Sequence, residues 1–342
     1  MSDFREQLAW ATEKLTALRA AVGSVLVGQK DVVDQVLVAM LAGGHVLLEG
    51  APGLGKTLLV RTMASSMDLT FSRIQFTPDL MPSDVVGTNV LVEQPGGGRG
   101  FSLHKGPIFG QIVLADEINR ATPKTQSALL EAMQESAVTI AGQRHALGPP
   151  FFVLATENPI EMEGTYPLPE AQLDRFMLKV IVPDPSEDDL VAVLDRTTSH
   201  ERDAPAAVLT RDDVLKLRAL CRDVAVTEQI TRYAARLVKC TSPQHPNAPS
   251  IAKRALRYGA GVRAAQSLLL GGKASALAAG KPHVSFHDIA AIARPALRHR
   301  LIRSFEGEAD GVTTDAVIDA LLESIPPRPV SVENALAEAQ RG

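Results

Sequence analysis

A short glycine-rich segment carries the most specific chemical pattern in the chain. It consists, in order, of Gly50, Ala51, Pro52, Gly53, Leu54, Gly55, Lys56 and Thr57. This order matches glycine, any four residues, glycine, lysine and then serine or threonine, the pattern of a phosphate-binding loop. Glycines let backbone N–H groups approach phosphate oxygens, a lysine reaches the β- and γ-phosphates, and a hydroxyl ligates Mg²⁺. We therefore expect residues 50–57, together with Leu58, to bind the phosphates of ATP and its Mg²⁺ ion.

The sequence on either side of this loop supports the expectation. Residues 45–49 form a short apolar run between glycines, which is typical of a buried strand that leads into a turn. A helical pattern follows the loop. The order of strand, glycine loop and helix is the context that the motif requires.

Two carboxylates end another apolar run. Asp116 and Glu117 follow residues 112–115 directly, and the carboxyl ends of parallel strands are where such sheets bind ligands. We expect Asp116 to hold Mg²⁺ and Glu117 to act as the general base that polarises the attacking water. Without the loop at Lys56, the same residues would be read as a strand that ends at the surface.

Asn158 follows a third apolar run, residues 151–155. If that run is a neighbouring strand of the same sheet, the amide is placed to orient the attacking water or to contact the γ-phosphate. Taken alone, it is an asparagine before a proline, which is a common turn.

The remaining pattern predicts the architecture that positions these residues. Short apolar runs at 45–49, 112–115, 151–155 and 177–182 alternate with helical segments, which favours an α/β fold with a mostly parallel sheet. Residues 87–106 and 138–147 alternate around glycines and are predicted to be hairpin insertions. From residue 188 onward the pattern is helical, and we expect no strand there.

The length and this change of pattern indicate two domains. A chain of 342 residues exceeds the roughly 100–200 residues of one ordinary domain. We expect an α/β core with a helical preface over residues 1–185, a linker helix and loop over 186–207, and a small all-helical domain over 208–342.

Composition and charge exclude several classes of protein. The chain has 35 basic and 39 acidic residues, a net charge of −4 and no block of like charges, so we expect no nucleic acid partner. No stretch has the roughly 18 apolar residues that a membrane span needs, and we expect a cytoplasmic protein. The only cysteines, Cys221 and Cys240, indicate neither a disulfide framework nor a zinc site.

Over nearly its whole length the sequence resembles the AAA+ ATPases, and within them the MoxR family. The blocks that carry the resemblance are residues 50–57, 74–80, 82–84, 106–109, 114–120, 124–133 and 155–176. The resemblance implies an AAA+ core in which the two hairpins are a helix-2 insertion and a pre-sensor-1 hairpin. It also implies that the C-terminal helical domain is the lid.

The resemblance further implies roles for individual residues. Asn158 is similar to the sensor 1 residue, and Arg175 stands where the family places the arginine finger that acts on a neighbouring subunit. Arg263 resembles the sensor 2 arginine, although Gly261-Val262 replaces the family's Ser-Pro before it, which leaves the lid angle open. A segment formed by Val27, Gly28 and Gln29 is similar to the family's adenine-side segment.

The function implied by this resemblance is an ATP hydrolase that forms homo-oligomeric, hexameric rings. Such a ring would remodel or mature protein clients, and proteins with a von Willebrand factor A domain are the expected class. One alternative is a nucleotide-gated scaffold, in which ATP binding rather than turnover controls association with a partner. A second alternative is a DNA-associated motor, which the acidic balance disfavours.

Overall fold

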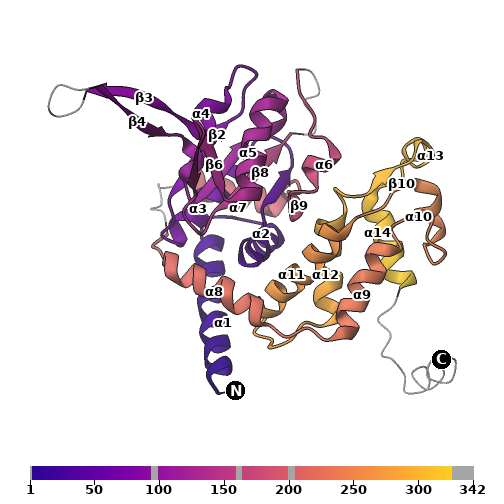
Figure 1. Ribbon diagram of the computed structural model, residues 1–342. Helices are drawn as coiled ribbons and strands as arrows, with labels where there is room; N and C mark the ends of the chain where they lie inside the picture. The colour runs from indigo at the N-terminus through magenta and orange to yellow at the C-terminus, as the bar shows by residue number, and fades with distance from the viewer. Residues whose placement is uncertain (1, 94–98, 159–163, 199–204, 326–342) are drawn as a thin grey trace. The chain divides into compact units, whose positions relative to one another are not determined.

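The computed structural model describes residues 2–93, 99–158, 164–198 and 205–325, and it separates into two compact units (Figure 1). One comprises residues 10–219 and is called the sheet unit here; the other comprises residues 1–9 and 220–342 and is called the helical unit. The domain boundaries expected near residues 185 and 207 remain a prediction.

The sheet unit is built on a five-stranded parallel sheet in the order β2-β5-β8-β1-β9. Its strands are β1 (Val46–Glu49), β2 (Phe71–Gln75), β5 (Ile112–Asp116), β8 (Phe152–Glu157) and β9 (Leu178–Ile181). The α/β fold with a parallel sheet is confirmed. The sequence pattern does not predict β2, because only Ile74 among its five residues is buried and the strand lacks an apolar run.

Helices precede, connect and follow the strands of this sheet. They are α1 (Ser2–Gly23, which begins in the helical unit), α2 (Lys30–Ala42), α3 (Lys56–Ser66), α4 (Pro82–Val86), α5 (Pro123–Glu135), α6 (Glu170–Leu173), α7 (Glu187–Thr198) and α8 (Arg211–Asp223, which ends in the helical unit). A buried cluster that includes Phe76, Leu129 and Phe176 packs on one face of the sheet. Burial on this scale fixes where each strand ends, and the strand ends carry the polar residues of interest.

Two antiparallel hairpins are inserted into the sheet unit, as the sequence predicts. The first pairs β3 (Gly87–Glu93) with β4 (Arg99–Lys105), and the second pairs β6 (Ala137–Ile140) with β7 (Gln143–Ala146). Figure 1 shows the β3–β4 hairpin extending away from the sheet.

The helical unit contains six described helices besides the ends of α1 and α8. These are α9 (Glu228–Lys239), α10 (Ser250–Ala255), α11 (Val262–Ala278), α12 (Phe286–Leu297), α13 (Phe305–Ala309) and α14 (Thr314–Ser324). The expectation of no strand after residue 188 is wrong in one detail, because β10 (Leu256–Tyr258) and β11 (Ile302–Arg303) form a short antiparallel pair. Three and two residues are too few to leave a periodic signal. Across the part of the chain that is described, no helix has the length and apolarity to cross a membrane.

Candidate active site

The glycine loop joins β1 to α3, as predicted. β1 ends at Glu49 and α3 begins at Lys56. Gly53 and Gly55 have φ values of +83° and +73°, a left-handed conformation that glycine adopts without steric cost. No side chain caps the first turn of α3, so its backbone N–H groups and helix dipole face the loop and can receive an anion. The predicted Leu58 belongs to the first turn of α3, with its side chain 46% exposed.

Lys56 is held at the base of this loop. Its side chain is buried, and Nζ donates hydrogen bonds to the carbonyl oxygens of Gly50 (2.5 Å) and Ala51 (3.2 Å). Burial lowers the pKa of Lys56 from its ordinary value, while the negative charges of Asp116 and Glu117 act to raise it. The structure therefore brings together the lysine and the two carboxylates that the sequence placed in one site.

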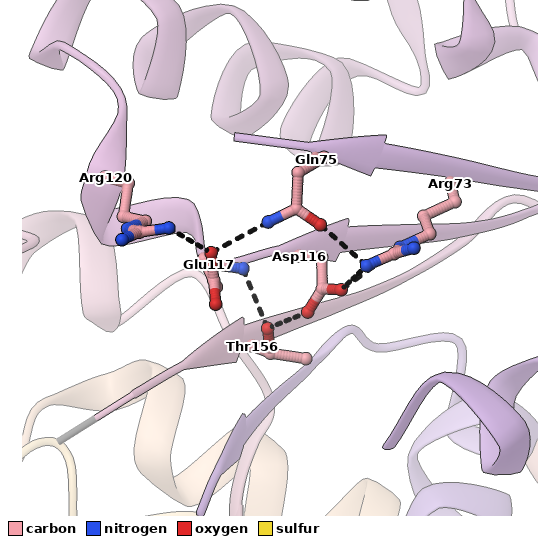
Figure 2. A network of polar contacts seen from close by, with 6 residues as sticks. All are labelled: Arg73, Gln75, Asp116, Glu117, Arg120 and Thr156. Atoms are coloured by element: carbon pink, nitrogen blue, oxygen red, sulfur yellow. Dashed lines mark hydrogen bonds and ion pairs between the residues drawn. The ribbon is translucent and has the colours of Figure 1, made fainter. Parts of the chain in front are cut away.

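Asp116 ends β5 and is buried, with hydrogen-bond donors on both carboxylate oxygens. The Thr156 hydroxyl donates to Oδ1 at 2.6 Å, and Arg73 donates to Oδ2 through Nε at 3.1 Å and Nη2 at 2.6 Å (Figure 2). Charge-assisted hydrogen bonds of this kind are short and directional. They hold the Asp116 carboxylate in one orientation at the edge of the sheet.

Glu117 leaves the strand in an unusual conformation. Its φ and ψ are 55° and 51°, the left-handed region, which costs a non-glycine residue roughly 1–2 kcal/mol. Its backbone N–H donates to the Thr156 hydroxyl at 2.8 Å, and its Oε2 accepts from Gln75 Nε2 at 2.8 Å and Arg120 Nη1 at 3.0 Å. Hydrogen bonds therefore hold both the backbone and the carboxylate of Glu117. Backbone strain of this type is common where a site requires a particular side-chain direction.

These contacts form a closed ring of polar groups (Figure 2). Arg73 Nη2 completes it with a 2.6 Å hydrogen bond to Gln75 Oε1. Gln75 and Thr156 lie within the quoted blocks 74–80 and 155–176 but received no role, and Arg73 was not named, because the roles of all three depend on strand pairing. Gln75 on β2 lies opposite Asp116 on β5, and Ala155 lies opposite Ala115, which sets Thr156 beside Asp116. Arg120, three residues after Glu117, was within the quoted block 114–120 but received no role.

The predicted adenine-side residues also lie against the loop. Gln29 Nε2 donates to the Leu54 carbonyl at 2.7 Å. A side chain at Gly28 would overlap the carboxylate of Asp189 near the start of α7. Residues 27–29, the loop and the start of α7 are therefore neighbours.

The remaining predicted residues occupy three different places. Asn158 is buried directly after β8, at the same edge of the sheet as the loop. Arg175 follows α6 and points to α5, where Nη1 donates to the Leu130 carbonyl at 2.9 Å. Arg263 lies in the first turn of α11 in the helical unit.

The donor atoms fit the expected Mg²⁺ ion. Mg²⁺ prefers hard oxygen ligands, and it keeps several waters while it binds one or two carboxylates and substrate phosphates. The Thr57 hydroxyl and the Asp116 carboxylate supply such oxygens. Among the described residues no group of three or more His, Cys, Asp and Glu could hold a metal. A Mg²⁺ ion at this edge would also take phosphate and water oxygens as ligands.

Comparisons with known proteins identify the class. Residues 45–178 match the model for the ATPase family associated with various cellular activities (AAA), and residues 248–321 match the model for the AAA lid domain. A solved structure from Cytophaga hutchinsonii, proposed to be an ATPase, has a TM-score of 0.88 at 39% identity and covers 95% of this chain and 98% of its own. The chain therefore has the AAA+ fold with a C-terminal lid, a class that binds nucleotide and in general hydrolyses ATP.

Curated relatives identify the family. The chain is 41% identical over 305 residues to the uncharacterized protein YeaC of Bacillus subtilis, with 89% of this chain and 92% of that protein covered. It is 38% identical over 320 residues to Chaperone MoxR1 of Mycobacterium tuberculosis, with 94% and 84% covered. The chain belongs to the MoxR family of AAA+ ATPases.

Proposed function

We propose that this chain hydrolyses Mg-ATP at the carboxyl edge of the sheet and uses the energy to remodel protein clients. The observation that carries the proposal is the ring around Asp116 and Glu117 beside Lys56, which holds two carboxylates at the end of a phosphate-binding loop. Hydrolysis requires such an arrangement, because a base must meet water next to the γ-phosphate.

Each residue has a defined task in this reaction. Water attacks the γ-phosphorus, the bond to the β–γ bridging oxygen breaks, and ADP and inorganic phosphate leave. Glu117 takes the proton of the attacking water, and Asn158 orients that water. Lys56 and the N-terminus of α3 neutralise charge on the phosphates. Magnesium, held by Thr57 and Asp116, would add further charge neutralisation to the phosphate oxygens.

Arg175 is proposed to complete the site of a neighbouring subunit within a hexameric ring. Two facts support this: the chain belongs to an AAA+ family, and its own Arg175 is held against α5. An arginine finger stabilises charge that develops on the transferring phosphoryl group and contributes about 10³ to 10⁵ in rate. Arg263, at the start of the lid helix α11, is proposed to contact the γ-phosphate.

The proposed clients are proteins, with von Willebrand factor A domain proteins as the expected class. Support comes from the relative that is named a chaperone. The variant Glu117→Gln distinguishes the remodelling proposal from the alternative of a nucleotide-gated scaffold, because it should bind ATP without turnover. Full client function in that variant would contradict the remodelling proposal.

Mixing two inactive variants tests turnover and the shared site together. Lys56→Ala and Arg175→Ala should each lose nearly all Mg-dependent phosphate release. In a random mixture, about one interface in four joins an intact loop to an intact finger, so activity should return to about a quarter of wild type. Phosphate release with and without EDTA measures this, and size-exclusion chromatography confirms co-assembly. Mixed rings without recovery would contradict the role of Arg175 in trans.

A further inference from the structure

The Thr156 hydroxyl touches both residues that carry the proposed chemistry. It lies on β8 with a side chain 1% exposed, 2.6 Å from Asp116 Oδ1 and 2.8 Å from the backbone nitrogen of Glu117. Figure 2 shows Arg73 hydrogen-bonded to Asp116, and Gln75 and Arg120 hydrogen-bonded to Glu117. Thr156 is hydrogen-bonded to both Asp116 and Glu117. We infer that Thr156 is a positioning residue that couples the metal-binding carboxylate to the general base, an inference that rests on the proposed hydrolysis of Mg-ATP.

The direction of both hydrogen bonds is fixed by valence. A hydroxyl has one proton and two lone pairs, and a backbone N–H can only donate. The Thr156 oxygen must therefore accept from Glu117, and its single proton is available for Asp116 Oδ1. One lone pair of Oδ1 is thus occupied, and the rotation of the Asp116 carboxylate is limited.

The second hydrogen bond acts on the backbone. Glu117 is left-handed at φ 55°, a conformation that persists in a non-glycine residue only where its surroundings enforce it. The bond from its N–H to Thr156 holds the peptide between Asp116 and Glu117. Without it, that peptide is free to rotate toward the commoner backbone regions. The Glu117 carboxylate would then move away from the position that Gln75 and Arg120 now hold.

Three variants isolate the hydroxyl. Thr156→Val keeps the shape of the side chain and removes both hydrogen bonds, and Thr156→Ser keeps both bonds and removes a methyl group. We expect Val to lower kcat for ATP about 10- to 100-fold, with KM within about 3-fold, because the loss falls on groups that act in the transition state. Ser should restore kcat to within about 3-fold of wild type. Thr156→Ala removes the hydroxyl in a smaller side chain if Val does not fold.

Thr125→Val is the matched control. Thr125 is also a fully buried threonine of the sheet unit, but its hydroxyl donates to the Leu80 carbonyl at 2.7 Å, outside the ring. Thr125→Val also replaces a buried hydroxyl by a methyl group, as Thr156→Val does, but it should leave kcat within about 3-fold of wild type. Circular dichroism and thermal unfolding of each variant show whether it is folded.

A binding measurement makes the test independent of turnover. Mn²⁺ replaces Mg²⁺ as an EPR probe, titrated into protein that carries a non-hydrolysable ATP analogue. We expect Thr156→Val to weaken Mn²⁺ binding several-fold and Thr156→Ser to leave it unchanged. Wild-type kcat and Mn²⁺ affinity in a folded Val variant, or a Ser variant as defective as Val, would overturn the inference. If the wild-type protein binds nucleotide but never releases phosphate, the proposed function fails, and the Mn²⁺ titration still decides the role of Thr156.

Discussion

The carboxyl edge of the sheet holds two acidic groups that use similar residue types in different ways. The first is the pair Asp116 and Glu117, with Arg73 as its nearest cation. The second consists of Glu49 and Glu157, which lie opposite each other at the ends of β1 and β8, with Lys179 on β9 bonded to Glu49 at 2.5 Å. Both groups lie at strand ends near the glycine loop.

The face of the sheet separates them. Successive residues of a strand point to opposite faces, so Thr156 and Glu157 face different ways. Thr156 meets Asp116 on one face. Glu157, one residue further, lies on the opposite face together with Glu49 and Lys179. Glu157 pairs with Glu49, and Lys179 pairs with Leu47, two residues before Glu49 on the same face of β1.

The electrostatics of the two groups also differ. The first pair is held in place by hydrogen-bond donors from Arg73 and Gln75. In the second, burial raises the pKa of Glu157, the charge of Glu49 raises it further, and the charge of Lys179 opposes both effects. A pair of carboxylates in fixed positions is suited to hold a metal and activate water, whereas a carboxyl group that is costly to ionise is expected to affect folding stability. The comparison teaches that position at a strand end does not make a carboxylate catalytic; its neighbours on the same face do.

The largest expected effect comes from replacing one glutamate of each group. Glu117→Gln removes the proposed general base and should lower kcat for ATP by about 100-fold or more. Glu157→Gln has the same change of atoms at the neighbouring strand end and should change kcat by less than about 3-fold, since its group takes no part in the chemistry. Steady-state phosphate release measures both. Equal losses in the two variants would remove the distinction between the groups.

How far the sequence predicts this site follows from where each contact lies along the chain. Lys56, Thr57, Asp116 and Glu117 were predicted because each belongs to a contiguous pattern at a strand end. Arg73 and Thr156 were not, since they reach Asp116 only through the pairing of β2 and β8 with β5. The sheet itself followed from apolar runs, except for the mostly polar β2. Arg175 and Arg263 came from family resemblance, and their roles remain predictions because they depend on a neighbouring subunit and on the lid.

A histidine at the other end of β1 gives the pH dependence of stability. His45 accepts from the Val153 N–H at 3.0 Å through Nδ1, so its neutral ring carries the proton on Nε2, which donates to the Met133 carbonyl at 3.1 Å. Burial is the main cause that lowers the pKa of His45 to about 4, from 6.5 in an unfolded chain. The contribution of neutral His45 to the free energy of unfolding is complete above pH 6.5 and is lost as pH falls from 6.5 toward 4.

From this shift we expect the free energy of unfolding to fall by about 2 kcal/mol between pH 7 and pH 5. Urea unfolding at both values measures it, with His45→Gln as the control that keeps a donor and an acceptor but does not titrate. Glu157 acts with the opposite sign, because its raised pKa means that protonation at low pH relieves a cost. The difference between wild type and His45→Gln therefore isolates the histidine. If both proteins showed the same pH dependence of the free energy of unfolding, groups other than His45 would be its cause.

The smallest expected effect separates charge from packing in the second group. Lys179→Met keeps most of the alkyl chain and removes the cation whose charge favours ionisation of Glu157. The side chains of Lys179 and Glu49 are 20% and 27% exposed, so we expect a loss of only about 1 kcal/mol in the free energy of unfolding at pH 8. The loss should shrink toward pH 4.5, because the raised pKa of Glu157 means that this carboxyl becomes protonated there and no longer needs a cation. Lys179→Arg should behave as wild type in urea unfolding, and kcat should be little changed in both variants. A loss that is equal at both pH values would mean that packing, not charge, holds this group together. Its contrast with the pair Asp116 and Glu117 would then rest on geometry alone.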